Sequence, residues 1–324
     1  MKPFESFLAS PINEYIAHRE SLGYRTKVQR SYLLTFDRYL KQTKADWKAL
    51  KPSFFLELRA NLHVESRTTN RILSTVRSLF QFLVRRAYIE ENPVCAIPPL
   101  RENTIVPFVF SPEQVDQVLK VICRGIRKTK GRFLTDLALY LAVLLLARCG
   151  MRISEPIGLL RHHYRHDDAT IYIEKTKFKK DRLIPVPQEV IPEIENYLSA
   201  RRALKRHDDN PYLLAGRGQK PLTDGQVRFL FHKALRDLDL NQPRRVMANV
   251  NFSQPTPHSL RHSFAVNTLE QIKERGQSHQ NALPVLATYM GHSDYKHTSV
   301  YLRVVDATSR QNLVDFALWQ KTKA

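Results

Sequence analysis

Four polar residues near the end of the sequence have types and spacings that suit the binding and nucleophilic attack of an anion. His258 and Arg261 are three positions apart, so a helix would carry both on one face. His292 follows a glycine, and Tyr301 comes nine positions later. A guanidinium and two imidazoles can bind an anion, and a phenol can attack it. A single histidine or tyrosine is more often part of a packed core, so the hypothesis rests on the combination.

Attack on a phosphodiester makes further demands that the rest of the sequence has to meet. The ester is an anion, and forked guanidinium donors suit the charge that develops in its transition state. A phenol with an ordinary pKa of about 10 needs neighbouring cations or a base to react. The leaving oxygen needs a proton, which a lysine desolvated among cations can supply. A further arginine and a lysine elsewhere in the chain would meet these demands.

The expected arginine is found at Arg152, after an apolar run that ends at Gly150. Glu155 stands three positions later, where a carboxylate can orient neighbouring side chains. Pro156 follows it, and a proline is tolerated in the first turn of a helix. We therefore predict a helix here with Ser154 as its N-cap.

The expected lysine falls in a basic turn between two predicted strands. Alternating apolar residues predict strands at 169–174 and 183–186, and 162–166 can supply a third strand of a small antiparallel sheet. The turn holds Lys175, Lys177, Lys179 and Lys180. Nonspecific contact with phosphates is the plain explanation for all four.

Histidines and aspartates gather just before these strands and raise the question of a metal. They are His162, His163, His166, Asp167 and Asp168. Their spacing matches no closed zinc signature, and a polar face of a strand and loop explains them equally well. We expect neither a metal nor another cofactor.

The net charge points to a polyanionic partner. The chain has 324 residues and a formal net charge of +20. The residues up to Pro107 carry a net +7 and the remainder a net +13, so both parts are basic. Such an excess is typical of proteins that bind nucleic acid.

Cysteines and apolar runs place the chain among proteins of the cytoplasm. Three cysteines without a Cys-x-x-Cys pair suggest neither a disulfide framework nor a cysteine zinc site. The first residues lack the apolar stretch of a signal peptide. The longest apolar run, 137–147, is too short to cross a bilayer and predicts a buried helix within a longer one at 133–147.

Apolar periodicity predicts an N-terminal helical domain at 1–92. Its four helices are expected at 11–22, 27–41, 54–60 and from Ser66 onward. Ser53 and Ser66 are the predicted N-caps of the last two. Basic residues of the second and fourth helices lack acidic neighbours, so we expect them to bind phosphates. They are Arg25, Lys27, Arg30, Arg67, Arg71, Arg77, Arg85 and Arg86.

Four prolines between 93 and 107 predict an extended linker, followed by a second domain at 108–324. Ser111 and Pro112 are a good N-cap and first helical residue. Another helix is predicted at 223–238 with Thr223 or Asp224 as its cap, and 242–255 is predicted as a loop. The fold class is mainly α with a small antiparallel sheet.

Together these motifs resemble the tyrosine recombinase (phage integrase) family over nearly the whole chain. His258-x-x-Arg261, Gly291-His292 and Tyr301 match the second half of its catalytic motif. Gly150-x-Arg152-x-x-Glu155 matches its first arginine box, with a proline where an apolar residue is usual. The segment 68–94 resembles the end of its SAM-like core-binding domain.

The resemblance implies a role for each residue. Tyr301 would be the nucleophile, Arg152 and Arg261 would bind the phosphate, and Lys177 would be the general acid, with Lys175, Lys179 and Lys180 as rivals that otherwise contact DNA. His258 would assist proton transfer, and His292 would bind the phosphate or position the phenol. Glu155 would support them.

The implied activity is site-specific cleavage and rejoining of double-stranded DNA through a 3′-phosphotyrosine, in DNA integration or transposition of a mobile element. The family also implies a homotetramer on paired sites, alone or with sister recombinases, whose C-terminal segments pass between protomers. Alternatives are DNA relaxation by a type IB topoisomerase and a noncatalytic DNA-binding regulator. The Gly-His box and the N-terminal helical domain favour the recombinase.

Overall fold

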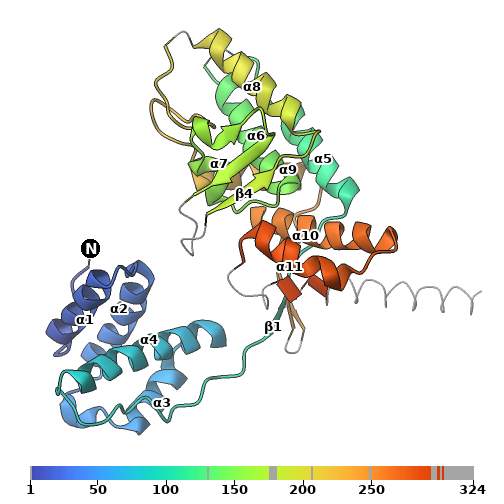
Figure 1. Cartoon of the computed structure of the whole chain (residues 1–324). Helices are drawn as coiled ribbons and strands as arrows, with labels where there is room; N and C mark the ends of the chain where they lie inside the picture. Colours follow the sequence, from blue (N-terminus) through green and yellow to red (C-terminus); the bar gives the residue numbers. More distant parts are fainter. Residues whose placement is uncertain are drawn as a thin grey trace, which may run out of the picture. The chain divides into compact units, whose positions relative to one another are not determined.

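The computed structural model describes residues 2–129, 131–174, 181–205, 207–247, 250–292, 298–299 and 301–302. The chain forms two compact units that divide between Thr104 and Ile105 (Figure 1). Helices dominate both, and the strands form small sheets in the second. The predicted fold class is confirmed.

The first unit is built from four α-helices and a short 3-10 helix. Their bounds are α1 (Ala9–Ser21), α2 (Lys27–Gln42), η1 (Trp47–Ala49), α3 (Pro52–Asn61) and α4 (Ser66–Arg85). Helix α4 buries the stripe expected from its sequence, including Ile72, Val76, Leu79 and Leu83, against α2 and α1. Burial of this stripe in one apolar core sets the arrangement of the helices.

The starts of two helices differ from the prediction. Helix α3 begins at Pro52 and has Lys51 as its N-cap, because a proline at the first helical position is already held at a helical φ. Helix α4 begins at Ser66 itself and follows Glu65. Ser53 and Ser66 therefore lie inside their helices and do not cap them.

The chain after α4 packs along that helix instead of leaving it. Arg77 donates to the carbonyls of Val94 and Ile97, and Asn70 exchanges hydrogen bonds with the backbone of Leu100. Val94 and Ile97 are buried in the same core as α4. This segment, part of the predicted linker, is thus an ordered piece of the first unit.

The second unit is organised around one fully apolar helix, α6 (Phe133–Arg148). Residues 138–147 of α6 are all buried, as the apolar run predicts. Among the helices that pack on it are α5 (Pro112–Arg124), α8 (Ile191–Leu204) and α9 (Asp224–Asp237). Ser111 caps α5 and Thr223 caps α9, each in a reciprocal pair with the glutamine three positions later. Both predicted caps are confirmed; α8 was not predicted.

The predicted antiparallel sheet is present. Strand β3 (Thr170–Ile173) pairs with β4 (Arg182–Pro185) and with the short β2 (Tyr164–Arg165). Ile171 and Ile184 lie opposite each other and are both fully buried. His162 and His163 form the 3-10 turn η2 (Arg161–His163) before β2.

The predicted loop at 242–255 contains two strands. Strands β5 (Arg245–Met247) and β6 (Val250–Phe252) pair antiparallel, and β6 also pairs with β1 (Thr104–Val106). These strands have three residues each, and their side chains are largely exposed. Three residues are too short a stretch for apolar periodicity to reveal a strand.

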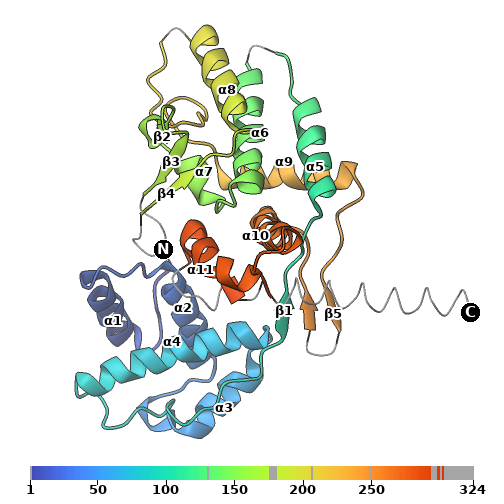
Figure 2. The same cartoon turned by 45° about the vertical axis from the view of Figure 1, so that its right-hand side comes forward.

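Two further helices complete the unit, α10 (Pro257–Glu274) and α11 (His279–Met290). They lie together at one end of the unit, while α8 reaches toward the other, as two views show (Figures 1 and 2). Helix α10 packs against α6 and α11 against β4, so the predicted motifs come from adjacent elements. Among the described residues, no helix is long and apolar enough to cross a membrane.

Candidate active site

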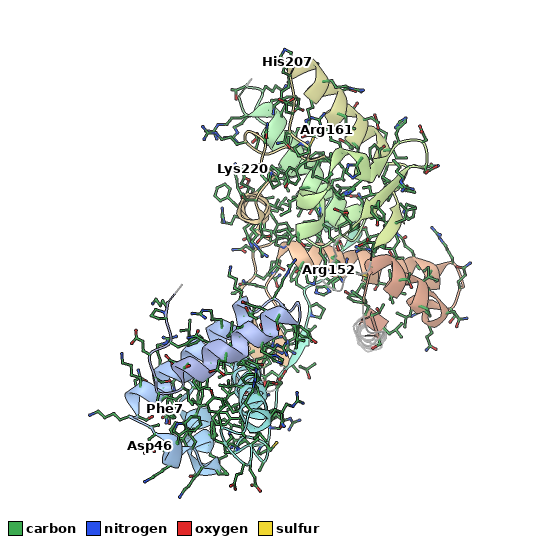
Figure 3. All side chains as sticks on the ribbon, turned by 60° about the vertical axis from the view of Figure 1, so that its left-hand side comes forward. Phe7, Asp46, Arg152, Arg161, His207 and Lys220 are labelled. Carbon is green, nitrogen blue, oxygen red and sulfur yellow. The ribbon has the colours of Figure 1, made fainter. Side chains whose placement is uncertain are left out.

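Arg152 lies in the turn between α6 and α7 (Ser154–Gly158), where the sheet side of the unit meets α10 and α11 (Figure 3). Its Nη1 donates to Oε1 of Glu155 at 2.9 Å, and its Nη2 donates to the carbonyl of Gly291 at 2.7 Å. The other Glu155 oxygen accepts the backbone N–H of Arg152 at 2.7 Å. Glu155, and not Ser154 as predicted, satisfies the start of this helix, because Ile153 takes the N-cap position.

Glu155 also binds a second arginine that the sequence analysis did not select. Arg182, the first residue of β4, donates from Nη1 and Nη2 to the two Glu155 oxygens at 3.0 and 2.8 Å. Burial alone would raise the pKa of Glu155, but the hydrogen bonds and charge of Arg182 outweigh it and the pKa is lowered. The carboxylate is therefore ionised, and it fixes two guanidinium groups.

Arg261 extends from α10 into the interior and is 1% exposed. It donates from Nη1 to the carbonyl of Gly150 and from Nη2 to that of Met290. Its burial, followed by the nearby charge of Arg152, lowers the pKa of Arg261 to about 10. Two like charges are held close together here, an arrangement that suits an anion bound between them.

The C-terminal end of α11 is held by three arginines. The helix is capped by Gly291, which has a left-handed conformation with a φ of 64°. The backbone carbonyls of residues 289–291 each accept a hydrogen bond from a different guanidinium; the pairs are Tyr289 with Arg182, Met290 with Arg261 and Gly291 with Arg152. Positive charge at the negative end of a helix dipole is stabilising.

His292 directly follows this clamp, and its ring is oriented from two sides. Its Nδ1 lies 2.7 Å from Oγ1 of the buried Thr298. Its ring stacks on that of Tyr301 at an interplanar angle of 29° and a centroid distance of 6.2 Å. The backbone turn at Gly291 thus sets the position of His292 beside the phenol.

Tyr301 is only 3% exposed, and its hydroxyl lies 3.0 Å from Nδ1 of His262. Burial raises the pKa of Tyr301 above 10.0, and the charges of Arg261 and Arg152 oppose this only in part. His258 lies one helical turn before His262, with ring centroids 4.6 Å apart. His262 was not selected from the sequence, although its spacing of four residues from His258 on one helix would have suggested it.

The structure brings Arg152, Glu155, His258, Arg261, His292 and Tyr301 into one site. The predicted lysines Lys175, Lys177, Lys179 and Lys180 lie outside the described residues, as does the C-terminal segment from Arg303 onward. His258 is exposed on the site's surface, and burial of its inner side and the neighbouring Arg261 lower its pKa to about 4. The predicted catalytic roles remain predictions.

Some of the basic residues predicted to bind DNA in the first unit are exposed and have no ion pair among the described residues, and others have partners within the unit. Arg25, Lys27 and Arg71 are exposed. Arg30 is partly buried; it donates to the carbonyl of Lys2 and stacks over Phe4 at 4.4 Å. Arg67 is exposed and pairs with Glu102 at 2.9 Å, while Arg77 binds the carbonyls of the segment after α4.

The histidines near β2 have structural partners. His163 is buried and accepts the backbone N–H of Leu160 at 3.1 Å. His166 lies 2.9 Å from Oε1 of Glu195 on α8. No group of three histidine, cysteine or carboxylate side chains suited to a metal ion occurs in the part of the chain that the structure describes.

Comparison with known proteins gives the same family for both units. The profile of the phage integrase family matches residues 109–308, and that of its N-terminal SAM-like domain matches residues 14–87. An integrase/recombinase of Sinorhizobium fredii, y4rE, is 29% identical over 313 residues, which are 93% of each chain. Tyrosine recombinase XerA of Pyrococcus furiosus is 27% identical over 309 residues, 94% of each chain.

Solved structures share the fold at lower identity. The Tn1549 transposon integrase in complex with circular intermediate DNA has a TM-score of 0.65 and 20% identity, covering 92% of this chain and 95% of that one. XerH bound to a palindromic difH substrate has a TM-score of 0.66 and 18% identity, covering 89% and 78%. With both family profiles matched, the chain belongs to the phage integrase family, the tyrosine-type site-specific DNA recombinases.

Proposed function

We propose that this recombinase cleaves double-stranded DNA with Tyr301 and rejoins it in the integration or transposition of a mobile element. The observation that carries the proposal is the convergence of Arg152 and Arg261 on the buried phenol of Tyr301. Two guanidinium groups can bind the nonbridging oxygens of one phosphate and neutralise the charge of the transition state. Solved relatives of the same fold hold DNA, among them a lambda integrase dimer on a core site.

In this mechanism the Tyr301 oxygen attacks phosphorus and the 5′-oxygen leaves. The products are a 3′-phosphotyrosine and a free 5′-hydroxyl, and Lys177 supplies the proton to the leaving oxygen. His292, stacked on Tyr301 and fixed by Thr298, directs its other nitrogen to the phosphate. Because the covalent link retains the energy of the phosphodiester, rejoining to another strand needs no nucleotide cofactor.

Ionised Glu155 has a supporting role in this site. It holds the guanidinium of Arg152 in one orientation through a buried pair, and Arg182 keeps it charged. The arginines of the first unit and the lysines of the β3–β4 turn contact DNA phosphates on either side of the cleaved bond. We propose a cytoplasmic homotetramer on two sites, assembled through the C-terminal segment.

A direct test is covalent trapping on candidate sites taken from the flanks of the protein's own gene. Nicked substrates that lose the 5′-fragment should accumulate protein–DNA complexes in excess EDTA, and the Tyr301→Phe variant should form none while it still binds the same DNA. Mapping of the DNA-linked peptide to Tyr289 or Tyr295 would refute the assignment of the nucleophile. Relaxation of supercoiled plasmid by a monomer, without exchange between sites, would support the topoisomerase alternative instead.

A further inference from the structure

The residue that contacts the phenol of Tyr301 is His262. Nδ1 of His262 lies 3.0 Å from the Tyr301 hydroxyl, a good hydrogen-bond distance. His258, to which the family resemblance assigns proton transfer, packs edge-on against the ring of His262 with ring centroids 4.6 Å apart. The direct path for the phenol proton therefore leads to His262.

His262 is held in position for this contact by its neighbours. It follows Arg261 in α10, and the guanidinium of Arg261 is fixed to the carbonyls of Gly150 and Met290. The rings of His262 and Tyr301 lie 5.6 Å apart between centroids, at an interplanar angle of 59°. A hydrogen bond from the phenol to Nδ1 assigns the ring proton to Nε2, the tautomer in which Nδ1 has a free lone pair.

The buried phenol needs an acceptor for its proton. Tyr301 is only 3% exposed, and its burial disfavours the phenolate. His262 is neutral in the DNA-free protein, because burial, His258 and Arg261 lower its pKa to about 3. A phosphate bound between Arg152 and Arg261 would offset their charge and raise the proton affinity of His262 as the substrate arrives.

Resting on the proposed function of Tyr301 as the nucleophile, we propose that His262 is a further catalytic residue, the general base of strand cleavage. The O–H bond of Tyr301 breaks, its proton moves to Nδ1, and the oxygen forms its bond to phosphorus while the bond to the 5′-oxygen breaks. In rejoining, the 5′-hydroxyl attacks phosphorus and gives its proton back to Lys177, while the departing Tyr301 oxygen recovers its own proton from the His262 imidazolium. Cleavage thus leaves His262 protonated, and rejoining returns it to its neutral starting state.

The decisive variant is His262→Asn, because the amide oxygen of asparagine can accept the same hydrogen bond but is not basic. Single-turnover formation of the covalent complex at pH 7 should slow by about 100-fold or more, the usual contribution of a general base. Its rate should rise with pH up to pH 10, since a growing fraction of Tyr301 is then already ionised before attack. Affinity for the site should change by no more than about twofold, because His262 touches the phenol and not the DNA. A variant with wild-type rate and pH profile would overturn the proposal.

A change in the nucleophile itself separates base catalysis from positioning. Replacing Tyr301 by a fluorinated tyrosine makes the phenol more acidic while barely changing its size. The factor by which His262→Asn slows covalent complex formation should then shrink at least tenfold, because a more acidic phenol depends less on a general base. A deficit that stays constant would show that His262 only positions the ring.

The same experiment on His258→Asn is the matched control, since that histidine lies one turn earlier on the same helix. If fluorination relieves the deficit of His258→Asn and not that of His262→Asn, the base is His258 and the proposal fails. Should His262→Asn fold poorly, His262→Ala with added imidazole replaces it, and rescue of cleavage by imidazole is the expected result. Absence of rescue by imidazole, in a folded protein that binds DNA, would contradict the proposal.

Failure of this inference can be told from failure of the proposed function. If the wild-type protein forms no covalent complex, or links through another residue, the assignment of Tyr301 falls and His262 loses its role with it. If the wild-type protein links through Tyr301 and His262→Asn cleaves equally well, only the general base is refuted.

Discussion

Gly291 and Arg182 lie so close that a β-carbon on residue 291 would come within 2.9 Å of Nη1 of Arg182. The guanidinium cannot easily move away, because it is bound to both oxygens of Glu155 and to the carbonyl of Tyr289. The glycine also has a φ of 64°, a conformation that other residues adopt at a cost. Its absent side chain is thus a requirement of the site as well as of the helix end.

Gly291→Ala should therefore destabilise the second unit and slow cleavage. The left-handed backbone costs about 1–2 kcal/mol, and displacement of Arg182 adds loss of activity. Gly276→Ala is the matched control, because Gly276 has a φ of 75° and nothing within 4 Å of its added β-carbon. Both variants should lose stability in thermal unfolding, Gly291→Ala the more, but only Gly291→Ala should lose cleavage rate, by about tenfold or more. Equal rates in the two variants would argue against the role of Arg182.

Arg182→Met should impair the site through Glu155. Of its two described arginine partners, Glu155 then keeps only Arg152, so the loss of stability should be a large part of the about 3–5 kcal/mol that breaking a buried ion pair typically costs. Arg182→Lys keeps the charge but loses the forked contact, so it should recover only part of this stability. The free energy of unfolding from denaturant titration would measure both effects.

The comparison for this variant is Arg228→Met in α9. Arg228 pairs with Asp224 at 2.7 Å, but both side chains are about half exposed. An exposed pair contributes about 0–1 kcal/mol, so this variant should unfold almost as the wild-type protein does. A large loss there, or a small one for Arg182→Met, would contradict the importance of the buried contact.

Acid should lower the free energy of unfolding of the DNA-free protein through the protonation of His262. Its pKa is about 3 when folded and about 6.5 when unfolded, so between these values the unfolded chain binds more protons. The stabilisation is complete above pH 6.5 and is lost as the pH falls, by up to about 1.4 kcal/mol per pH unit. The charged and titratable groups that face it are His258, Arg261, His292 and Tyr301.

Hydrogen exchange of peptides from α10 between pH 7 and pH 5, corrected for the intrinsic rate, would follow this loss in the second unit alone. His262→Asn does not titrate and should show a smaller loss of protection over the same range. Identical losses in the two proteins would place the acid sensitivity elsewhere.

Lys177→Ala should abolish cleavage of ordinary DNA but cleave a substrate with a sulfur at the 5′-bridging position. The thiolate leaves without a proton, so the general acid becomes unnecessary. Lys179→Ala and Lys180→Ala should instead weaken binding and reduce its salt dependence. If the sulfur substrate restores cleavage by one of these variants, or by Lys175→Ala, and not by Lys177→Ala, then that other lysine is the general acid.

Deletion of the chain after Thr308 should leave binding of one protomer to one site but remove synapsis of paired sites and strand exchange. The sequence beyond it carries Leu313, Phe316, Ala317 and Trp319, an apolar set suited to docking on a neighbour. Size measurements on DNA with one and two sites would decide this. A truncated protein that still forms tetramers and recombines would show that the segment serves only its own domain.

The residues that the sequence predicted best are those whose role depends on local spacing. His258 and Arg261 share a helix face because of their separation in sequence, and Ser111 caps α5 because of its neighbours. Arg182 could not be found in this way. Its partners are Glu155 and Tyr289, 27 and 107 residues away, and nothing in a strand-initial arginine specifies them.

The same limit applies to the arginines of α4. In the sequence, Arg67, Arg71 and Arg77 look equally free for phosphates, because the segment that approaches them is more than fifteen residues away. In the structure Arg77 is committed to backbone carbonyls and Arg67 to Glu102, while Arg71 is exposed. Tertiary packing, and not composition, decides which cations remain available.

The three arginine contacts with the end of α11 couple the position of this helix to the positions of the site residues. The guanidinium groups meant for a phosphate are held by the helix end that also carries His292, so neither half can be moved without the other. A small displacement of α11 would release the arginines, shift the histidine and withdraw the stacking partner of Tyr301 together. For a site-specific DNA recombinase, a site that is either fully assembled or inactive limits unwanted cleavage. Whatever moves α11 would act as its switch.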